Sequence, residues 1–469
     1  MLRRSQSGDR PDGDGGRRLT RAGLPPGPSA FSLGNIGKVQ RDIIGFFREC
    51  NERYGDFVTV RVGPTRRLLL QDPDVIEQML SRNNRDFVKP YLVRSTRMLG
   101  NGLLSSDGET WIRQRRLAQP SFQAKAIEGY GRVILEHTER MLAGWADGEA
   151  RDVYASFKHL TLEIIAQIIF GEDAGPAALE TLELFSFAFE RFGKRLKSPV
   201  PLPDAFPSPG NIRLLKAIQR IDAALYTLIR LRREGGDEPR KDLLTHLCRA
   251  RMEDGSLLDE RQIRDEIASF IAAGHDANAA VVTWAALLLA EYPDRQRDLQ
   301  LELDTVLAGR APTVADVHRL PLTEAIVLEA MRLYPPVWVF GREPIRDCDL
   351  GGYRIKKGTS ILVCQYLLHR DRRFFDDPDS FRPERWLPGS PRCHPYAFVP
   401  FGAGPRRCIG ESLAMMESIL VLVSLCQRFS LTKAPSTQVE LATNLTLIPK
   451  GGLVLSMSKR VPVPLAAVS

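Results

Sequence analysis

Apolar residues recur with helical periodicity along most of this chain, and that pattern limits the folds open to it. Side chains three and four residues apart form one stripe on a helix, whereas strands alternate with a period of two. Stretches of the second kind are few. We therefore predict a mainly α fold with small peripheral β-sheets (α+β). The predicted helices cover residues 109–118, 126–146, 156–170, 177–194, 210–234, 259–290, 293–309, 322–333 and 411–428.

Strand-like segments are short, and two pairs of them flank turn residues. Gly and Pro between two apolar runs favour a hairpin. The predicted strands are residues 57–62 and 67–70 as a hairpin around Gly63-Pro64, residues 360–363, and residues 445–448 and 453–455 as a hairpin around a Pro-Lys-Gly-Gly turn.

The chain is predicted to form one large helical domain behind a polar tail. Residues 1–23 are rich in Arg, Gly and Asp and nearly devoid of apolar residues, which predicts a disordered N-terminal tail. No repeat or second long linker interrupts residues 24–465. One domain over 24–465 therefore fits better than the three modules that 469 residues would otherwise suggest.

Charge and cysteine content narrow the partners and the compartment. The formal net charge of +8 favours an acidic partner, either nucleic acid, an anionic membrane or an acidic protein, but no nucleic-acid-binding motif accompanies it. The seven cysteines are odd in number and contain no C-x-x-C pair, which argues against a disulfide framework and favours a cytoplasmic location. No apolar stretch reaches the ~20 residues of a membrane span, so we expect no transmembrane anchor.

A cysteine in a glycine-rich loop carries the clearest chemistry. Cys408 comes just before the helical pattern that starts at Glu411, where the helix dipole and free N–H groups favour a thiolate and lower its pKa. Gly402, Gly404 and Gly410 let the backbone turn tightly and approach a flat ligand, and Arg406 is placed to pair with an anion. These residues predict Cys408 as the thiolate ligand of a haem iron.

The spacing F-x-x-G-x-R-x-C-x-G over residues 401–410 resembles the cysteine-loop signature of the cytochrome P-450 superfamily, and the resemblance extends over about residues 24–460. It implies the P-450 fold and haem b (iron protoporphyrin IX) bound through Cys408. It also implies electrons that come from NAD(P)H through an acidic ferredoxin or flavodoxin and its reductase. The residues that it assigns to haem binding in this loop are Phe401, Gly404, Arg406 and Gly410.

Two charged segments also resemble parts of this family. Glu329 and Arg332 are spaced i, i+3 and so share one helix face, like the family's E-x-x-R helix. Arg385 lies in a P-E-R segment about fifty residues later. The resemblance implies that these three residues form a buried charge network bracing the cysteine loop. Trp386 replaces the Phe more frequent in the family, which we interpret as neutral packing variation.

Further candidates for haem binding lie outside the loop. Trp111 and Arg115 share a helix face at i, i+4, and an indole N–H and a guanidinium are suitable donors to a haem propionate. They resemble the family's W-x-x-x-R helix. Arg342 matches another propionate-binding position of the family.

Residues 270–278 resemble the family's oxygen-activating helix, A-G-x-D/E-T. Gly274 inside a helix costs ~1 kcal/mol relative to Ala, which predicts a local opening with room for dioxygen and water. The resemblance implies that Asp276 relays protons. The usual alcohol is replaced by Ala277, followed by Asn278. Three hypotheses follow: Asn278 or an ordered water substitutes for the hydroxyl, a substrate hydroxyl does so, or the enzyme runs a peroxide-driven or non-oxygenating reaction.

The expected substrate is lipophilic, because the segments that line the pocket in similar proteins are apolar here. A terpenoid, fatty acid, steroid or polyketide would fit, hydroxylated or epoxidised by a monomeric monooxygenase. A peroxygenase, dehydratase or isomerase, and a non-catalytic haem sensor, are the alternatives. The predicted pocket residues are Ala273, Ala277, Val337, Val339 and Phe340, and the predicted partner surface contains Arg113, Arg116 and Arg407.

Overall fold

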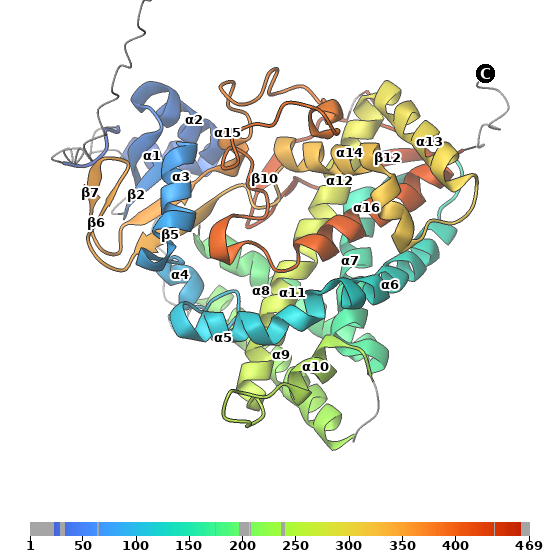
Figure 1. The fold of residues 1–469 in the computed structure, drawn as a ribbon, viewed down its shortest axis with the longest axis horizontal. Coiled ribbons are helices and arrows are strands. Elements are labelled where there is room, and N and C mark those ends of the chain that lie inside the picture. Colours follow the sequence, from blue (N-terminus) through green and yellow to red (C-terminus); the bar gives the residue numbers. More distant parts are fainter. Residues whose placement is uncertain are drawn as a thin grey trace, which may run out of the picture.

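Helices fill most of the molecule in a computed structural model, as predicted (Figure 1). The structure describes residues 23–460 apart from 29–32, 63–64, 174, 197–205, 207, 236–239 and 436. Nearly all of the predicted tail, and the turn of the first hairpin, therefore lie outside the described residues. The helices are α1 (Leu33–Arg41), α2 (Ile43–Tyr54), α3 (Pro73–Glu77), α4 (Tyr91–Arg94), α5 (Gly108–Ala118), α6 (Ala124–Ala143), α7 (Val153–Phe170), α8 (Pro176–Leu196), α9 (Pro209–Glu234), α10 (Leu243–Arg249), α11 (Glu260–Gly274), α12 (Asp276–Glu291), α13 (Pro293–Leu307), α14 (Pro321–Leu333), α15 (Gln365–Leu368) and α16 (Glu411–Arg428).

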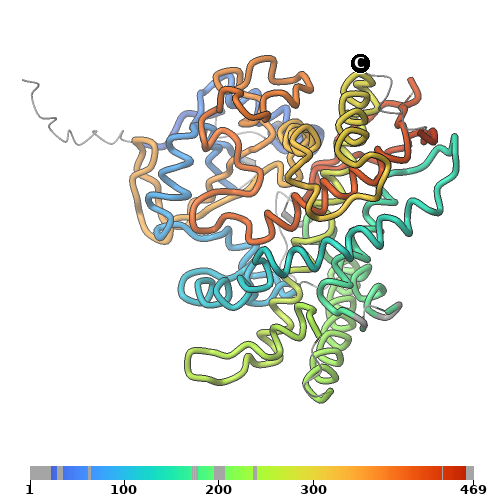
Figure 2. Tube along the Cα trace, turned by 45° about the vertical axis from the view of Figure 1, so that its right-hand side comes forward, coloured from blue at the N-terminus to red at the C-terminus, as the bar shows by residue number. Residues whose placement is uncertain are grey.

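The strands form small sheets at the periphery. The largest sheet has the order β1-β2-β8-β5-β3, in which β2 and β8 are parallel and the other neighbours antiparallel. It lies to the left in Figure 1, and α9 and α10 project at the bottom in both Figure 1 and Figure 2. The strands are β1 (Phe57–Val62), β2 (Thr65–Leu70), β3 (Phe87–Val88), β4 (Glu149–Asp152), β5 (Phe340–Pro344), β6 (Cys348–Leu350), β7 (Tyr353–Ile355), β8 (Ser360–Val363), β9 (Phe429–Thr432), β10 (Leu441–Thr443), β11 (Leu447–Pro449) and β12 (Val454–Lys459).

The predicted C-terminal hairpin is wrong. Strand β11 pairs with β10, while β12 lies between β4 and β9 in a separate sheet. The Asp152 side chain accepts a hydrogen bond from Leu453 N (3.0 Å), and Val153 N donates to Leu453 O (2.8 Å), which fixes β12 beside β4. Strand β4 lies far from β12 in the sequence, so the local turn pattern gave no sign of this pairing, whereas β10 directly precedes β11.

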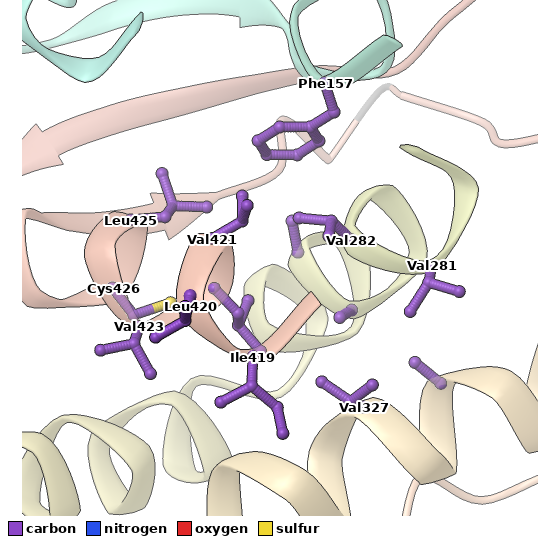
Figure 3. Packing of buried hydrophobic residues seen from close by; sticks show 14 of the residues in the cluster. Phe157, Val281, Val282, Val327, Ile419, Leu420, Val421, Val423, Leu425 and Cys426 are labelled. Carbon is purple, nitrogen blue, oxygen red and sulfur yellow. The ribbon is translucent and has the colours of Figure 1, made fainter. Parts of the chain in front are cut away.

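Two hydrophobic cores meet along the long helical segment that the sequence predicts over 259–290. The first core combines α12 with α6, α7, α13, α14 and α16, and Figure 3 shows Phe157, Val282 and Val421 within it. The second combines α11 with α8, α9, α10 and part of α7. The predicted helix is in fact two helices, because His275 separates α11 from α12.

One helix, α7, is long and apolar enough to cross a membrane by length and composition alone. Most of its side chains contribute to the two cores, among them Phe157, Ile164 and Phe170. A buried core helix passes the same test as a membrane span, so its apolar character is explained by packing.

Candidate active site

The cysteine loop is a tight turn that leads into α16. Cys408 N donates to Phe401 O (2.9 Å), and Arg407 N donates to Gly404 O (3.0 Å). Gly404 has a φ of +67°, and a Cβ there would lie 2.1 Å from the Leu80 carbonyl oxygen, so the predicted need for glycine is confirmed at this position. The need for glycine is not confirmed at residue 410. Gly410 has a φ of −89°, and a Cβ there would make only ordinary van der Waals contacts.

Cys408 is an exposed residue, but neighbouring segments of the chain crowd its thiol and partly desolvate it. Its pKa is raised, chiefly by burial and secondly by Glu411, against the lowering influence of the Gly410 N–H and the guanidinium groups of Arg115 and Arg407. The predicted lowering of the pKa is therefore wrong for the protein alone, since desolvation outweighs the helix terminus. Coordination to a metal cation is what stabilises a thiolate in such surroundings.

The predicted propionate-binding residues gather beside the loop. The Arg406 guanidinium lies over the Trp111 ring at 4.4 Å, and that of Arg115 lies 5.6 Å from the same ring. Arg115 also donates to the Arg407 carbonyl (2.8 Å), which joins α5 to the cysteine loop. Arg342 is half-buried, and desolvation together with neighbouring Arg406 lowers its pKa to about 10.

Lys89 is a member of this cationic group that sequence reasoning missed. Its Nζ donates to the carbonyls of Leu103 (2.9 Å) and Ser106 (3.3 Å), and Arg406 donates to the same Ser106 carbonyl. Burial lowers the Lys89 pKa to about 7, with Arg406 and Arg342 adding to the effect. The segment around Lys89 carries no pattern that would have distinguished it from a surface lysine.

The charge balance of this cluster fits haem. Four cations converge there: Lys89, Arg115, Arg342 and Arg406. Among the described residues, the carboxylate that forms an ion pair with this group is Asp107, through Arg406. Burying unbalanced cations is costly unless an anion joins them. The two propionates of haem would supply that charge, next to an accessible cysteine thiol.

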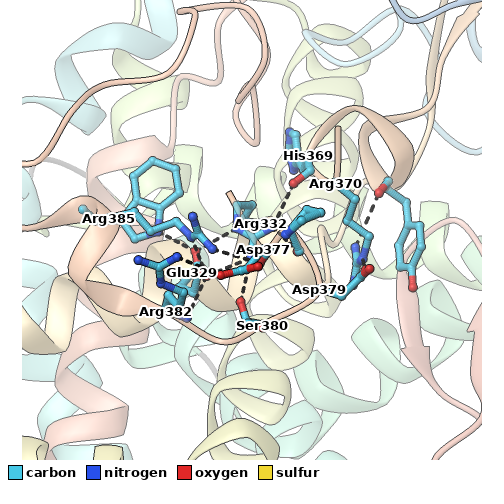
Figure 4. Close-up of polar contacts among 12 residues, drawn as sticks. Glu329, Arg332, His369, Arg370, Asp377, Asp379, Ser380, Arg382 and Arg385 are labelled. Carbon is cyan, nitrogen blue, oxygen red and sulfur yellow. Dashed lines mark hydrogen bonds and ion pairs between the residues drawn. The ribbon is translucent and has the colours of Figure 1, made fainter. Parts of the chain in front are cut away.

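The predicted charge network is confirmed by direct contacts (Figure 4). Arg332 and Glu329, both fully buried, pair through two hydrogen bonds of 2.8 Å. Arg385 Nε lies 3.1 Å from Glu329 Oε1. Trp386 Nε1 donates to Glu329 Oε2 (2.8 Å), so the interpretation of Trp386 as neutral packing variation is wrong: a Phe could not make this bond.

This network reaches the cysteine loop through His369. Arg332 donates to the His369 carbonyl (2.9 Å), and the His369 ring nitrogen Nε2 accepts from Val399 N (3.2 Å), two residues before Phe401. On the other side, the Trp386 ring packs against Phe398 with centroids 4.3 Å apart. The geometry thus agrees with a bracing function for the network.

The helix opening predicted at Gly274 is present. A Cβ on Gly274 would lie 2.8 Å from Ile165 Cδ1 on α7. Glycine is therefore required here for close packing against α7, as well as for the break in the helix. The His275 carbonyl accepts from Thr161 Oγ1 (3.0 Å). His275 Nδ1 lies 3.0 Å from the Ile271 carbonyl, so Nδ1 carries the proton and Nε2 accepts from Ser186 Oγ on α8 (2.9 Å).

The side chains on either side of Ala277 point to different helices. Asp276 accepts from Tyr154 OH (3.1 Å) and lies 4.0 Å from Lys158 Nζ, both on α7. Asn278 instead donates to Glu417 Oε2 on α16 (2.9 Å). Glu417 was missed by sequence reasoning, although a single acid on the apolar face of the predicted helix 411–428 is a detectable signal.

The predicted pocket residues belong to two segments of the chain, and both segments have solvent-accessible surface. Ala273 is exposed and Ala277 half-buried, although both belong to helices whose other faces are packed in the cores. Val337 is exposed, and Val339 and Phe340 are half-buried. Accessible small side chains beside the helix break are compatible with a lining for an apolar ligand.

Comparison with known proteins decides the family. The family model of cytochrome P450 matches residues 24–457. The chain belongs to the cytochrome P450 family. Membership confirms the predicted fold class and the activity class, an oxidoreductase that incorporates molecular oxygen, and it implies haem bound through a cysteine thiolate.

Relatives of this P450 include bacterial enzymes of similar length. Cyclooctatin synthase from Streptomyces melanosporofaciens is 32% identical over 398 residues, 84% of this chain and 87% of the relative. Pentalenene oxygenase from Streptomyces avermitilis is 31% identical over 447 residues, 94% and 98% of the two chains. Among solved structures, the cytochrome P450DA heme domain matches with a TM-score of 0.84 at 24% identity, covering 95% of this chain and 99% of that domain.

Proposed function

We propose that this P450 is a monooxygenase that hydroxylates or epoxidises a terpenoid. The observation that carries the proposal is the accessible surface of Ala273 and Ala277 at the helix break, which offers small apolar walls to a substrate. The names of similar proteins, pentalenene oxygenase and cyclooctat-9-en-7-ol 5-monooxygenase, specify carbocyclic terpenoid substrates. Haem, when bound, supplies the oxygen chemistry.

The chain's own residues position the cofactor and move protons. Arg115, Arg342 and Arg406 would hold the propionates, and Cys408 would hold the iron. The Lys158 side chain is 39% exposed and that of Asp276 15% exposed, so this pair connects solvent to the helix break. Tyr154 donates to Asp276 and fixes the carboxylate toward α7. Asp276 would accept protons from solvent at this point and pass them inward.

The substrate class is tested with the haem-loaded protein and a panel of terpenes, fatty acids, steroids and polyketides. Terpenes are expected to shift the haem absorption band at the lowest concentrations and to be oxidised when dioxygen, NAD(P)H, a ferredoxin and its reductase are supplied. Product formation with peroxide alone, or without any oxidant, would instead favour the peroxygenase, dehydratase or isomerase alternative that Ala277 raises. Turnover of any substrate excludes a non-catalytic sensor.

Ala277→Thr separates the three explanations for the missing hydroxyl. If Asn278 or a water already substitutes for it, as we expect, the coupling of NAD(P)H oxidation to product stays unchanged. If a substrate hydroxyl substitutes for it, the threonine displaces that group and coupling falls with the native substrate. If nothing substitutes for it, coupling rises. The measurement is the ratio of product formed to NAD(P)H consumed.

The redox partner is proposed to dock where α5 and the cysteine loop reach the surface. Arg113 and Arg116 are exposed there, although Glu253 and Asp254 lie close by and Arg407 is paired with Glu411. An acidic ferredoxin or flavodoxin would be attracted by the arginines at low salt.

We also propose that the protein is a monomer and is located in the cytoplasm. The seven free cysteines support the proposed location, because free thiols persist in a reducing compartment.

Charge reversal tests this surface. The double variant R113E/R116E is expected to raise the Kd for the partner roughly tenfold at low ionic strength, since exposed charges contribute ~0.2–1 kcal/mol each. Salt is expected to weaken binding by the wild type and to have less effect on the variant. Arg354→Glu on β7, in another sheet, serves as the matched control and should leave Kd unchanged. Binding independent of salt would contradict the proposal.

A further inference from the structure

The turn formed by residues 99–106 is attached to α11 by side chains of that helix. Three backbone N–H groups of the turn donate to three side chains of α11: Asn101 N to Asp265 Oδ2 (2.8 Å), Leu103 N to Glu266 Oε2 (3.0 Å) and Leu104 N to Ser269 Oγ (3.2 Å). The turn approaches the helix so closely that a Cβ on Gly102 would lie 2.1 Å from the Asp265 carbonyl oxygen. The site described so far makes no use of this attachment.

Glu266 is a buried carboxyl in this attachment. Its residue surface is 3% exposed, and its second oxygen, Oε1, accepts from Gln262 Nε2 (2.8 Å). Burial raises the pKa of Glu266 to about 7, against the hydrogen bonds from Leu103 N and Gln262. The neutral acid and the carboxylate are therefore both populated near neutral pH, and each form has an acceptor oxygen for Leu103 N–H. The contact with the turn does not require the charge.

The opposite side of the same turn holds two of the cations that gather beside the cysteine loop. Lys89 Nζ donates to the carbonyls of Leu103 (2.9 Å) and Ser106 (3.3 Å), and Arg406 donates to the same Ser106 carbonyl (3.3 Å). Leu103 is thus held at both of its polar groups, at N–H by Glu266 and at the carbonyl by Lys89. The turn therefore connects α11 directly to the cationic cluster.

The cations need this support because they repel one another. Burial is the main cause of the lowered pKa of Lys89, and the charges of Arg406 and Arg342 lower it further. Carbonyl oxygens offset part of such repulsion, but only where they stay within hydrogen-bond distance of the cations. Lys89 is half-buried, so its side chain can turn toward solvent when the turn moves away from it.

We propose that Glu266 is a positioning residue for haem binding. By holding Leu103 N–H, it keeps the carbonyls of Leu103 and Ser106 in place, and these carbonyls keep Lys89 and Arg406 aimed at the propionates. Retention of the cofactor thereby depends on a buried acid of α11, the helix that also carries Ala273 of the predicted substrate pocket. The inference rests on the proposed placement of the propionates beside these cations.

The first test measures the turn itself, by hydrogen exchange of a peptide containing residues 99–106 in the haem-loaded protein. Glu266→Ala removes the acceptor of Leu103 N–H, so exchange of this amide is expected to become about tenfold faster or more. Glu266→Gln keeps an acceptor oxygen and is expected to stay close to the wild type. Unchanged exchange in Glu266→Ala would overturn the proposal.

The second test measures the rate of haem release, by transfer of haem to an excess of apomyoglobin. Glu266→Ala is expected to raise this rate about tenfold, and Glu266→Gln less than about threefold. Lys89→Met should also raise it. In the double variant Glu266→Ala/Lys89→Met the rate should rise by less than the product of the two single effects, because Glu266 acts in part through Lys89. Effects that multiply fully, or release that Glu266→Ala does not change, contradict the proposal.

Glu302→Ala is the matched control for a general loss of stability. Glu302 also accepts from two backbone N–H groups, those of Leu322 (2.7 Å) and Thr323 (3.0 Å), but it joins α13 to α14 in the first core. This variant should unfold at lower denaturant concentration and change haem release by less than about twofold. Equal acceleration in Glu302→Ala and Glu266→Ala would refute a positioning function. If Arg115→Leu leaves haem release unchanged, the proposed propionate site fails, while exchange of the Leu103 amide still reports on Glu266.

Discussion

Replacing Cys408 by alanine is expected to abolish the thiolate-dependent red shift in the absorption spectrum of the reduced carbonyl complex, together with dioxygen-dependent turnover. The thiol is accessible, next to a cluster of cations that fits the haem propionates, and its surroundings disfavour a thiolate unless a metal is bound. Removing the sulfur deletes the ligand and leaves no neighbouring replacement in the loop, residues 401–410.

The matched control for this experiment is Cys348→Ala. Cys348 is half-buried on β6, and burial raises its pKa to about 11, so it too is a partly accessible, protonated thiol. This variant should keep the red-shifted band. A band that persists in Cys408→Ala would refute the assignment of the ligand.

The second large effect is expected from Glu329→Gln. The carboxylate accepts from Arg332, Arg385 and Trp386, and it also accepts from Arg382 N (2.9 Å). A neutral amide leaves two guanidinium groups without a counter-charge, at a cost of ~3–5 kcal/mol in the free energy of unfolding. Denaturant unfolding of the haem-loaded protein, followed by circular dichroism and by the haem band, measures this loss.

Two further variants show whether buried geometry is responsible. Arg332→Lys keeps the charge but loses the two-pronged pairing and the bonds to the carbonyls of His369 and Pro378, so it should also be strongly destabilised. Asp349→Asn breaks an exposed pair with Arg354 and should cost less than ~1 kcal/mol. Equal losses in Glu329→Gln and Asp349→Asn would contradict the importance of the buried network.

Features coded by short-range spacing could be predicted from the sequence. Gly404 and Cys408 in the loop, the Glu329–Arg332 pair and the opening at Gly274 are each defined by a few neighbouring residues, and the helices by local periodicity. The position of β12 could not be predicted, because its partners depend on how distant segments pack.

Electrostatics and the direction of side chains were also beyond the sequence. The helix terminus at Cys408 suggested a lower pKa, but the degree of burial, which determines the sign, is a property of the folded chain. Likewise, Asn278 belonged to a recognised motif, while its partner Glu417 became visible only once α12 and α16 were placed together. The same holds for Lys89, whose burial results from contacts with the 103–106 turn.

The break at His275 has a consequence for local unfolding, because it separates the helices of two hydrophobic cores. Because α11 belongs to one hydrophobic core and α12 to the other, a thermal fluctuation that separates α8 and α9 disrupts contacts of the second core alone. The first core, around α16, keeps its own packing contacts during such an event. The cysteine loop touches both cores, because Phe401 packs against the first and Ile409 against the second, so such an opening removes one of the two apolar supports of the loop.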